Sequence, residues 1–465
     1  MLPAALHALR RDRAPGRAFS GFEMVAMIAS LTLVMGFVPA GGHAQASYEF
    51  PLPDWSEQVE MREGWLETRQ EMLLPMMRRH DIDMWITVNE EFHDDPLTEY
   101  VAPPRPYTGG RDMFVFVDTG EGLRKVAITG FSEVNLKRFF ESPDEPRPAS
   151  EVLPALFEEH DPQRIALAMD GGKGMTRSLT YSSYNYLSEI MGPEATSRFV
   201  SAADLIEEYL DTRLPAELEP YRNLVHLTEI IAKRSLSDEV IEPGVTTVGD
   251  VRRWIYDAMW HYRVDTWFQP DLRLQRHGKE NDTSRGFLAV APEHWVIERG
   301  DVLHLDVGIS YLGLDTDWQK KAYVLREGET EAPAGLRAAM ANTNALQDVL
   351  ISTARPGATA GEVYKATMAE MEARGINAQI YSHPLGTHGH AIGPSIDFRS
   401  ADRPDRQARR LRDKSYISIE LNTRTPVPEW DDQVVYIMME DPAHLDDDGY
   451  HFFRPRQESF YLIGG

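Results

Sequence analysis

The chain has 465 residues, 42% of them hydrophobic and 26% charged, which is enough for two globular domains of ordinary size. Its 73 acidic and 48 basic residues give a formal net charge of −25 at pH 7, which disfavours nucleic acid and anionic membranes as partners because phosphates are repelled. The absence of cysteine excludes disulfides, thiolate metal sites and a cysteine nucleophile, and leaves the redox compartment undecided.

Residues 1–46 have the pattern of a secretory signal peptide. Four arginines precede an apolar run at 24–38, and small residues then lead to Ala44-Gln45-Ala46, a sequence typical of a signal cleavage site. We therefore predict cleavage near Ala46–Ser47 and an exported mature chain, periplasmic or extracellular, without stable membrane insertion. The run is short for a membrane span, and an uncleaved anchor is the alternative.

The segment 54–215 alternates helical and strand-like patterns. Apolar residues at helical spacing predict a helix at 60–80. Further helices are predicted at 153–160 and 184–191, and strands at 81–88, 113–117, 125–128 and 164–168. This alternation predicts a smaller α/β domain that ends near Leu214-Pro215-Ala216.

The segment 217–465 opens with a predicted helix at 217–233 and contains an internal repeat. Pro243–Val251 resembles Pro356–Val363, and each copy precedes a helical pattern and then an extended segment, at 264–268 and 376–381. Each copy also carries a capping box, Thr247 with Asp250 and Thr359 with Glu362. A duplicated helix-plus-strand unit predicts an α+β domain with pseudo-twofold symmetry and a curved antiparallel sheet.

Within the strand-like stretch 299–324, three aspartates lie at 306–317, around a glycine turn. Asp306, Asp315 and Asp317 are expected inside or beside a sheet, where a carboxylate is costly unless it is paired, protonated or bound to metal. Because three carboxylates this close repel one another, a bound cation is one explanation. A solvated acidic turn is the other.

Further metal-ligand types follow downstream. His390 lies between Gly389 and Gly393, and the strand-like runs 416–421 and 434–441 contain Glu420 and Glu440. Carboxylates with one imidazole suit Mn, Co, Fe or Zn rather than a thiolate-type structural zinc site. Four carboxylates exceed the needs of one divalent ion, so we predict two ions that share carboxylate bridges.

These motifs resemble the M24, or pita-bread, metallopeptidase superfamily in its creatinase, aminopeptidase P and prolidase branch. Ligands in that family run Asp, Asp, His, Glu, Glu. The first two are eleven residues apart, the histidine lies in a Gly-His-x-x-Gly turn, and the last glutamate precedes a glycine by nine residues. The matching positions, and therefore the implied metal ligands, are Asp306, Asp317, His390, Glu420 and Glu440.

The resemblance implies a pita-bread catalytic domain at 217–465 behind a creatinase-like N-terminal domain at 54–215. It implies an Xaa-Pro aminopeptidase or prolidase-like enzyme that uses two divalent ions (Mn, Co, Zn or Fe) and a metal-bridging hydroxide to hydrolyse a peptide bond. Glu420 is the implied proton shuttle. The substrate is expected to be a small peptide or another small molecule, and a homodimer is compatible with the resemblance.

The sequence departs from the family pattern at three places. Asp397 stands where a histidine is expected seven residues after the ligand histidine, and Met438 where an arginine is common. Another expected histidine falls at Leu288 or Ala289. The histidines near enough in sequence to substitute are His277, His294, His383 and His388. We prefer the last two as catalytic residues, with surface or packing histidines as the alternative.

Other functions remain open from the sequence. The departures favour a non-peptidase hydrolase or lyase on the same scaffold, of which creatinase is an example. A metal-binding protein without catalysis is a further alternative, and so is an unrelated protein with ordinary surface acids. Asp315 has no counterpart in the family pattern.

Overall fold

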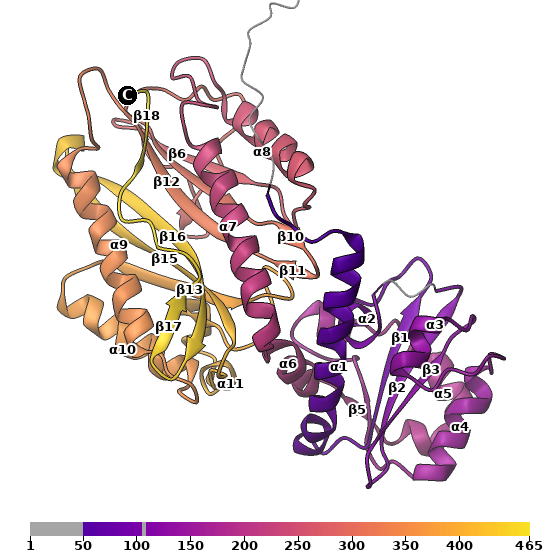
Figure 1. Ribbon diagram of the computed structural model, residues 1–465. Coiled ribbons are helices and arrows are strands. Elements are labelled where there is room, and N and C mark those ends of the chain that lie inside the picture. Colours follow the sequence, from indigo (N-terminus) through magenta and orange to yellow (C-terminus); the bar gives the residue numbers. More distant parts are fainter. Residues whose placement is uncertain (1–49, 105–107) are drawn as a thin grey trace, which may run out of the picture. The chain divides into compact units, whose positions relative to one another are not determined.

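The computed structural model describes residues 50–104 and 108–465 (Figure 1). The predicted signal peptide, 1–46, lies outside the described residues. No helix within the described ranges is long and apolar enough to cross a membrane.

The first part of the chain forms a five-stranded mixed sheet in the order β3-β2-β1-β4-β5. β1 pairs antiparallel with β2 and parallel with β4, so a β2–β3 hairpin extends an otherwise parallel sheet. Its strands are β1 (Met84–Glu90), β2 (Arg111–Asp118), β3 (Leu123–Ile128), β4 (Ile165–Leu167) and β5 (Phe199–Ser201). Its helices are α1 (Trp55–Arg79), α2 (Thr98–Val101), α3 (Val134–Phe139), α4 (Ala149–His160), α5 (Tyr181–Thr196) and α6 (Ala203–Asp211).

Each face of this sheet is covered by helices. Leu73 and Met77 of α1 pack against Trp85 on one face, and Leu153 of α4 packs against Ile86 on the other. The predicted helices and strands of this segment are therefore confirmed. The domain limits 54–215 and 217–465 stay a prediction.

The second part forms a nine-stranded sheet in the order β14-β13-β15-β16-β12-β9-β6, with β17 added to β16 and β18 to β12. Its pairings are antiparallel except that of β12 with β18. The strands are β6 (Asp271–Gln275), β9 (Val302–Val307), β12 (Trp318–Val324), β13 (Ala378–Leu385), β14 (Ile396–Asp397), β15 (Tyr416–Val427), β16 (Gln433–Asp446), β17 (Gly449–Phe452) and β18 (Tyr461–Ile463). Two short hairpins join β7 (Thr283–Ser284) to β8 (Phe287–Leu288) and β10 (Ser310–Tyr311) to β11 (Leu314–Asp315).

The internal repeat is visible in the helices of this part (Figure 1). Both predicted capping boxes form, before α8 and before α10. The helices are α7 (Leu218–Ser235), α8 (Val248–Tyr262), α9 (Ala334–Thr353), α10 (Ala360–Ala373) and the short α11 (Pro404–Gln407). The prediction of an α+β fold is confirmed.

One predicted segment of the repeat is wrong. Residues 264–268 form no strand: Asp265 makes a single bridge to Ser310, and the strand begins later, at Asp271. The Thr266 hydroxyl donates to the carbonyl oxygens of Phe268 and Gly308, which bends the chain before it can pair. The strand of the other copy, β13, agrees with the prediction.

Strand alternation separates the two faces of the large sheet. Leu303 and Leu305 of β9 pack with α7 and α8, while Ile419 of β15 packs with α9 and α10. Because neighbouring side chains on a strand point to opposite faces, Asp306 and Glu420 lie on the face away from these helices. The fold therefore places the candidate ligands together on one side of the sheet.

Candidate metal centre

Strand register aligns the acidic residues across the sheet. Asp306 of β9 is opposite Gln319 of β12, Gln319 is opposite Glu440 of β16, and Glu440 is opposite Glu420 of β15. Directly opposite residues have Cβ atoms about 5 Å apart. The three carboxylates of this row are therefore close enough to bind the same metal ion. Asp317, just before β12, joins Asp306 and Glu440 in a group whose ligand atoms lie within 4.8 Å of one another.

His383 lies among these carboxylates. Its Nε2 atom is 3.4 Å from Glu420 Oε2, 3.4 Å from Glu440 Oε1 and 3.7 Å from Asp317 Oδ2. The side chain is buried, at 7% relative exposure for the residue. It belongs to two of the three groups of residues that could hold a metal ion.

His390, the histidine expected as the ligand, lies further out. It is exposed, and it joins only the group formed with Asp317 and His383. The rings of His383 and His390 meet edge-on, with centroids 4.6 Å apart. His390 is seven positions after His383. In the family pattern, a substrate-binding histidine is expected at this distance after the ligand histidine. The geometry thus favours His383 as the ligand, with His390 beside it.

Several polar atoms of the cluster are buried without a hydrogen-bond partner. They are Asp306 Oδ1, Asp317 Oδ1, His383 Nε2 and Glu440 Oε2. Buried carboxylates without partners are costly, and a divalent cation satisfies such atoms directly. The donor set of carboxylates and one imidazole fits a first-row divalent metal.

The electrostatics of the cluster agree with this fit. Burial, followed by the charge of Glu440, raises the pKa of Asp306 and Asp317 well above the usual range and also raises the pKa of Glu420. Burial opposes a proton on His383, but Glu420 and Glu440 raise its pKa to about 10. Ionised carboxylates are therefore disfavoured in this cluster by the protein alone, and a bound metal would stabilise them.

Two supporting residues were missed from the sequence. Gln319 Nε2 donates to Glu420 Oε1 at 2.6 Å and to Asp306 Oδ2 at 3.3 Å, which fixes both carboxylates. Ser418 Oγ donates to Glu440 Oε1 at 2.5 Å. Both side chains lie on the same face of their strand as the acids. The alternation of side chains along β12 and β15 could therefore have indicated them from the sequence.

The positions that depart from the family pattern have definite partners. Asp397 forms an ion pair with Arg399, whose Nε lies 2.9 Å from Asp397 Oδ2. Met438 Sδ lies 3.9 Å from Nη1 of Arg273, a β6 residue whose Nη2 is also 3.8 Å from Asp306 Oδ2. A guanidinium from a different strand thus reaches the position at which the family pattern has arginine.

His388, the other preferred histidine, lies outside the three groups that could hold a metal. Its Nδ1 accepts a hydrogen bond from the backbone N–H of His390 at 2.9 Å, and its ring packs on Trp267 with centroids 5.2 Å apart. A Cβ at Gly389 would lie 2.0 Å from the Trp267 ring, so this position requires glycine. His388 therefore helps to shape the loop that carries His390.

Asp315 also acts on this loop. Its Oδ2 accepts the N–H of Gly389 at 3.1 Å, and its backbone N–H donates to the Gly386 carbonyl at 2.7 Å. Burial raises its pKa to about 6. The aspartate without a family counterpart thus ties the β10–β11 hairpin to the histidine loop.

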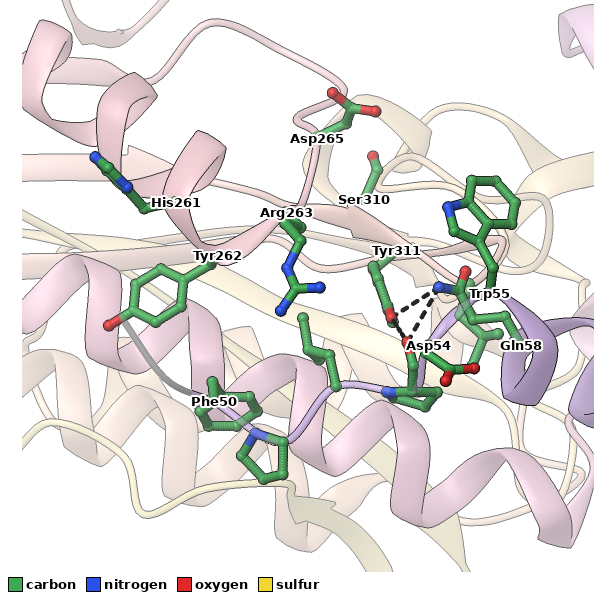
Figure 2. Close-up of a pocket in the computed structure, with 14 residues that line it drawn as sticks. Phe50, Asp54, Trp55, Gln58, His261, Tyr262, Arg263, Asp265, Ser310 and Tyr311 are labelled. Atoms are coloured by element: carbon green, nitrogen blue, oxygen red, sulfur yellow. Dashed lines mark hydrogen bonds between the residues drawn. The ribbon is translucent and has the colours of Figure 1, made fainter. Parts of the chain in front are cut away.

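Two large cavities differ in their relation to this cluster. One, of about 650 Å³, lies between the chain at 50–58, the end of α8 and the β10–β11 hairpin (Figure 2). Tyr311 lines it and hydrogen-bonds to Gln58 and the Pro53 carbonyl, but none of the clustered acids does. A second cavity, of about 610 Å³, is lined by both His383 and His390. The second cavity therefore borders the cluster at His383, and active sites combine such concavity with perturbed ionisable groups.

Comparison with known proteins agrees with this geometry. Residues 231–448 match metallopeptidase family M24. The fold resembles X-Pro aminopeptidase from Thermotoga maritima MSB8, with TM-score 0.60 and 16% identity over 85% of this chain and 99% of that one. It also resembles Xaa-Pro dipeptidase from Bacillus anthracis, with TM-score 0.60 and 17% identity over 86% and 99% of the two chains.

A third solved structure, proline aminopeptidase P II from Yersinia pestis, has TM-score 0.59 and 14% identity over 84% of this chain and 95% of that one. None of the curated proteins compared matches the chain. At these identities the solved structures establish the fold alone. Residues 231–448 are therefore identified as a segment of the metallopeptidase family M24 type, within a chain that shares the fold of these solved structures.

Proposed function

We propose that the protein is a dinuclear metallopeptidase of the Xaa-Pro type, which removes or releases a residue N-terminal to proline in small peptides. The observation that carries the proposal is the convergence of four carboxylates and two histidines on one face of the sheet, with buried ligand atoms that have no hydrogen-bond partner. The names of the structures with similar folds point to the same substrates.

Asp306, Asp317, His383, Glu420 and Glu440 are the residues that we propose hold two divalent ions. This set differs from the sequence prediction in one member, because His383 replaces His390 among the carboxylates. When bound, the ions supply Lewis-acid polarisation of the scissile carbonyl and activation of a water nucleophile.

Glu420 is the proposed proton carrier. Gln319 fixes its Oε1 at 2.6 Å, which leaves Oε2 on the side of His383. Burial and the charge of Glu440 raise its pKa, so this carboxylate can hold a proton and return it to the leaving amine.

His390 is the proposed substrate-binding histidine. It lines the 610 Å³ cavity next to His383, and partial burial of its ring lowers its pKa. The imidazole is therefore neutral near pH 7, and it can donate a single N–H to a substrate carbonyl oxygen without carrying charge.

The proposal is tested with the purified chain, loaded separately with Mn, Co and Zn, on a panel of Xaa-Pro dipeptides and tripeptides. We expect cleavage of at least one peptide, and loss of about two to three orders of magnitude in kcat for Glu420→Gln with the fold retained. Metal binding without cleavage of any peptide would favour a non-peptidase hydrolase or lyase on the same scaffold. Full activity of Glu420→Gln would refute the proton-carrier role.

We also propose that residues 1–46 direct export and are removed, and that the mature enzyme forms a homodimer. The basic, apolar and small-residue pattern of the N-terminus supports export. N-terminal sequencing of the protein from the exported fraction should give a chain starting near Ser47, and its mass in solution should be twice that of one chain. An intact N-terminus or a monomer would contradict the respective proposal.

A further inference from the structure

The cavity of about 650 Å³ shown in Figure 2 has no part in the chemistry proposed above, because none of the clustered acids lines it. Its walls are mainly aromatic and aliphatic, and they come from three segments: the chain at 50–58, the end of α8 and the β10–β11 hairpin. A cavity of this volume lies within the range of sites for small ligands. It is therefore a candidate for a second binding site.

Hydrogen bonds hold two aromatic rings of the wall in place. The Tyr311 hydroxyl accepts a hydrogen bond from Gln58 Nε2 at 2.9 Å and donates one to the Pro53 carbonyl oxygen. The Tyr262 hydroxyl accepts a hydrogen bond from Arg234 Nη1 at 3.0 Å. A ligand that packs on these rings meets a surface that needs little further ordering, which favours binding.

Two residues of the wall have a left-handed backbone. Arg263, which caps the end of α8, has φ of 59°, and Leu312, in the turn of the β10–β11 hairpin, has φ of 61°. This conformation is unfavourable for residues with a side chain, whereas glycine adopts it freely. Such strain is often found where a ligand is held. Its presence at two points of one cavity favours a role for these two side chains.

Opposite charges lie near Tyr311 in this cavity. Arg263 is exposed, and no ion pair or side-chain hydrogen bond is found for its guanidinium among residues 50–104 and 108–465. Asp54 Oδ1 accepts the N–H groups of Ser56 and Glu57, each at 3.0 Å, and its Oδ2 has no bond within the same ranges. Burial raises the pKa of the Tyr311 hydroxyl, and Arg263 and Asp54 shift it in opposite directions, so both charges are close to it.

We infer that this cavity is a second ligand site, which binds a small zwitterion with an apolar side chain, its carboxylate at Arg263 and its ammonium group at Asp54. Charge-assisted hydrogen bonds suit both ends of such a ligand, and the aromatic wall suits its side chain. Free amino acids and dipeptides share this chemistry. The inference goes beyond the proposed function and does not depend on peptide cleavage.

The β10–β11 hairpin connects this cavity to the loop that carries His390. Ser310, which lines the cavity, lies directly opposite Asp315 in the hairpin. Asp315 in turn accepts the N–H of Gly389 at 3.1 Å and donates its own N–H to the Gly386 carbonyl at 2.7 Å. A ligand stabilises the conformation to which it binds. Binding at the cavity therefore favours the position of the hairpin in which Asp315 holds this loop.

Calorimetry of the purified full chain in the presence of Mn tests the site, with L-phenylalanine and the dipeptide Ala-Phe as probes. We expect at least one probe to bind. The C-terminal amide and the N-acetyl derivative of the tighter probe each lack one charge, and each should bind about tenfold more weakly. Comparison of the two probes shows whether the cavity takes a free amino acid or a dipeptide.

Arg263→Gln and Asp54→Asn remove the two charges of the cavity. Asparagine caps a helix as well as aspartate does, so the second variant keeps the start of α1. Each variant should bind the tighter probe about tenfold more weakly than the wild type. Arg337→Gln is the matched control and should bind it equally, since Arg337 is a half-exposed residue of α9 outside this cavity. The inference would be overturned if neither probe binds, if the amide and N-acetyl derivatives bind as tightly as the zwitterion, or if neither variant weakens binding.

Hydrogen exchange at Gly389 tests the connection to the loop. A saturating probe should slow exchange of this N–H by about fivefold or more in the wild type. Asp315→Ala removes the acceptor, so the probe should still bind but no longer slow this exchange. An unchanged exchange rate in the wild type with the probe bound would overturn the connection. Both measurements are made without turnover, so failure of the peptidase proposal would leave their results intact.

Discussion

At the scale of single residues, the roles that we propose for His383 and His390 differ although the two rings are in contact. His383 is buried among Glu420 and Glu440, whereas His390 is exposed at the cavity. We expect His383→Ala to weaken metal binding by at least about 100-fold, because it removes a ligand rather than a supporting residue. His390→Ala should keep the metal and lower kcat by about 10²- to 10³-fold.

Metal content by elemental analysis and steady-state kinetics check this pair of variants. His388→Ala is the control, since its ring packs on Trp267 away from the carboxylates and should leave the metal content unchanged. If His390→Ala loses the metal and His383→Ala retains it, the original sequence assignment was the correct one.

The sequence pointed to four of the five positions that we propose as ligands but could not choose among the histidines. The glycines at 389 and 393 match the family turn around His390, yet His383 is also followed by a glycine three residues later, Gly386. Only the register of β13 against β15, which puts His383 opposite Ser418, shows which imidazole faces the acids. Which of the two histidines is buried depends on the pairing of strands that are distant in sequence. The spacing of residues within a short motif carries no information about that pairing.

Asp95 supplies a test of pH dependence away from the metal centre. It is buried at 5% exposure and accepts the N–H of Leu97 at 2.9 Å, while burial raises the pKa of its carboxyl to about 6. Because the folded chain then holds this proton more tightly than the unfolded chain, the free energy of unfolding falls as pH rises from about 4 to 6. Relative to Asp95→Asn, the wild type should lose up to about 3 kcal/mol over this range.

Urea unfolding at several pH values measures this difference. Asp94→Asn, the exposed neighbour, should follow the wild type at every pH. A constant difference between the wild type and Asp95→Asn from pH 4 to 7 would show that the carboxyl is not perturbed.

At the scale of elements, β12 and β16 are joined by a buried ion pair behind the candidate metal centre. Lys320 donates to Asp441, whose two oxygens also accept Trp318 Nε1 at 2.9 Å and Gln347 Nε2 at 2.8 Å. Each residue of the pair is only 1% exposed. Lys320→Met should cost about 3–5 kcal/mol of unfolding free energy, because Asp441 is left as an unpaired buried charge.

Adding Asp441→Asn to Lys320→Met should recover most of that loss, because the second change removes the unpaired charge. Chemical denaturation of the two variants and the wild type gives the comparison. A double variant that is as unstable as Lys320→Met alone would show that packing, not charge, explains the loss.

Elements that depend on local sequence were predicted well. Both capping boxes and the strands around Asp306, Glu420 and Glu440 could be predicted because their signals lie within a few residues. The segment 264–268 was predicted wrongly because the Thr266 hydroxyl bonds to a carbonyl of the distant β9–β10 turn. That contact depends on the assembled sheet.

At the scale of the whole molecule, charge is sorted between two neighbouring regions. The sheet face collects Asp306, Asp317, Glu420 and Glu440, while the cavity in front of it is lined by an excess of cations. Divalent ions would balance the charge of the acids on the sheet face.

The central claim, that these side chains form a dinuclear centre, is tested most directly by metal analysis of the purified mature protein combined with anomalous scattering from its crystals. The account predicts about two transition-metal ions per chain, both in contact with the carboxylates of Asp306, Asp317, Glu420 and Glu440, and with His383 as the imidazole ligand. A protein that binds no metal, or that binds it away from these carboxylates, would contradict the account.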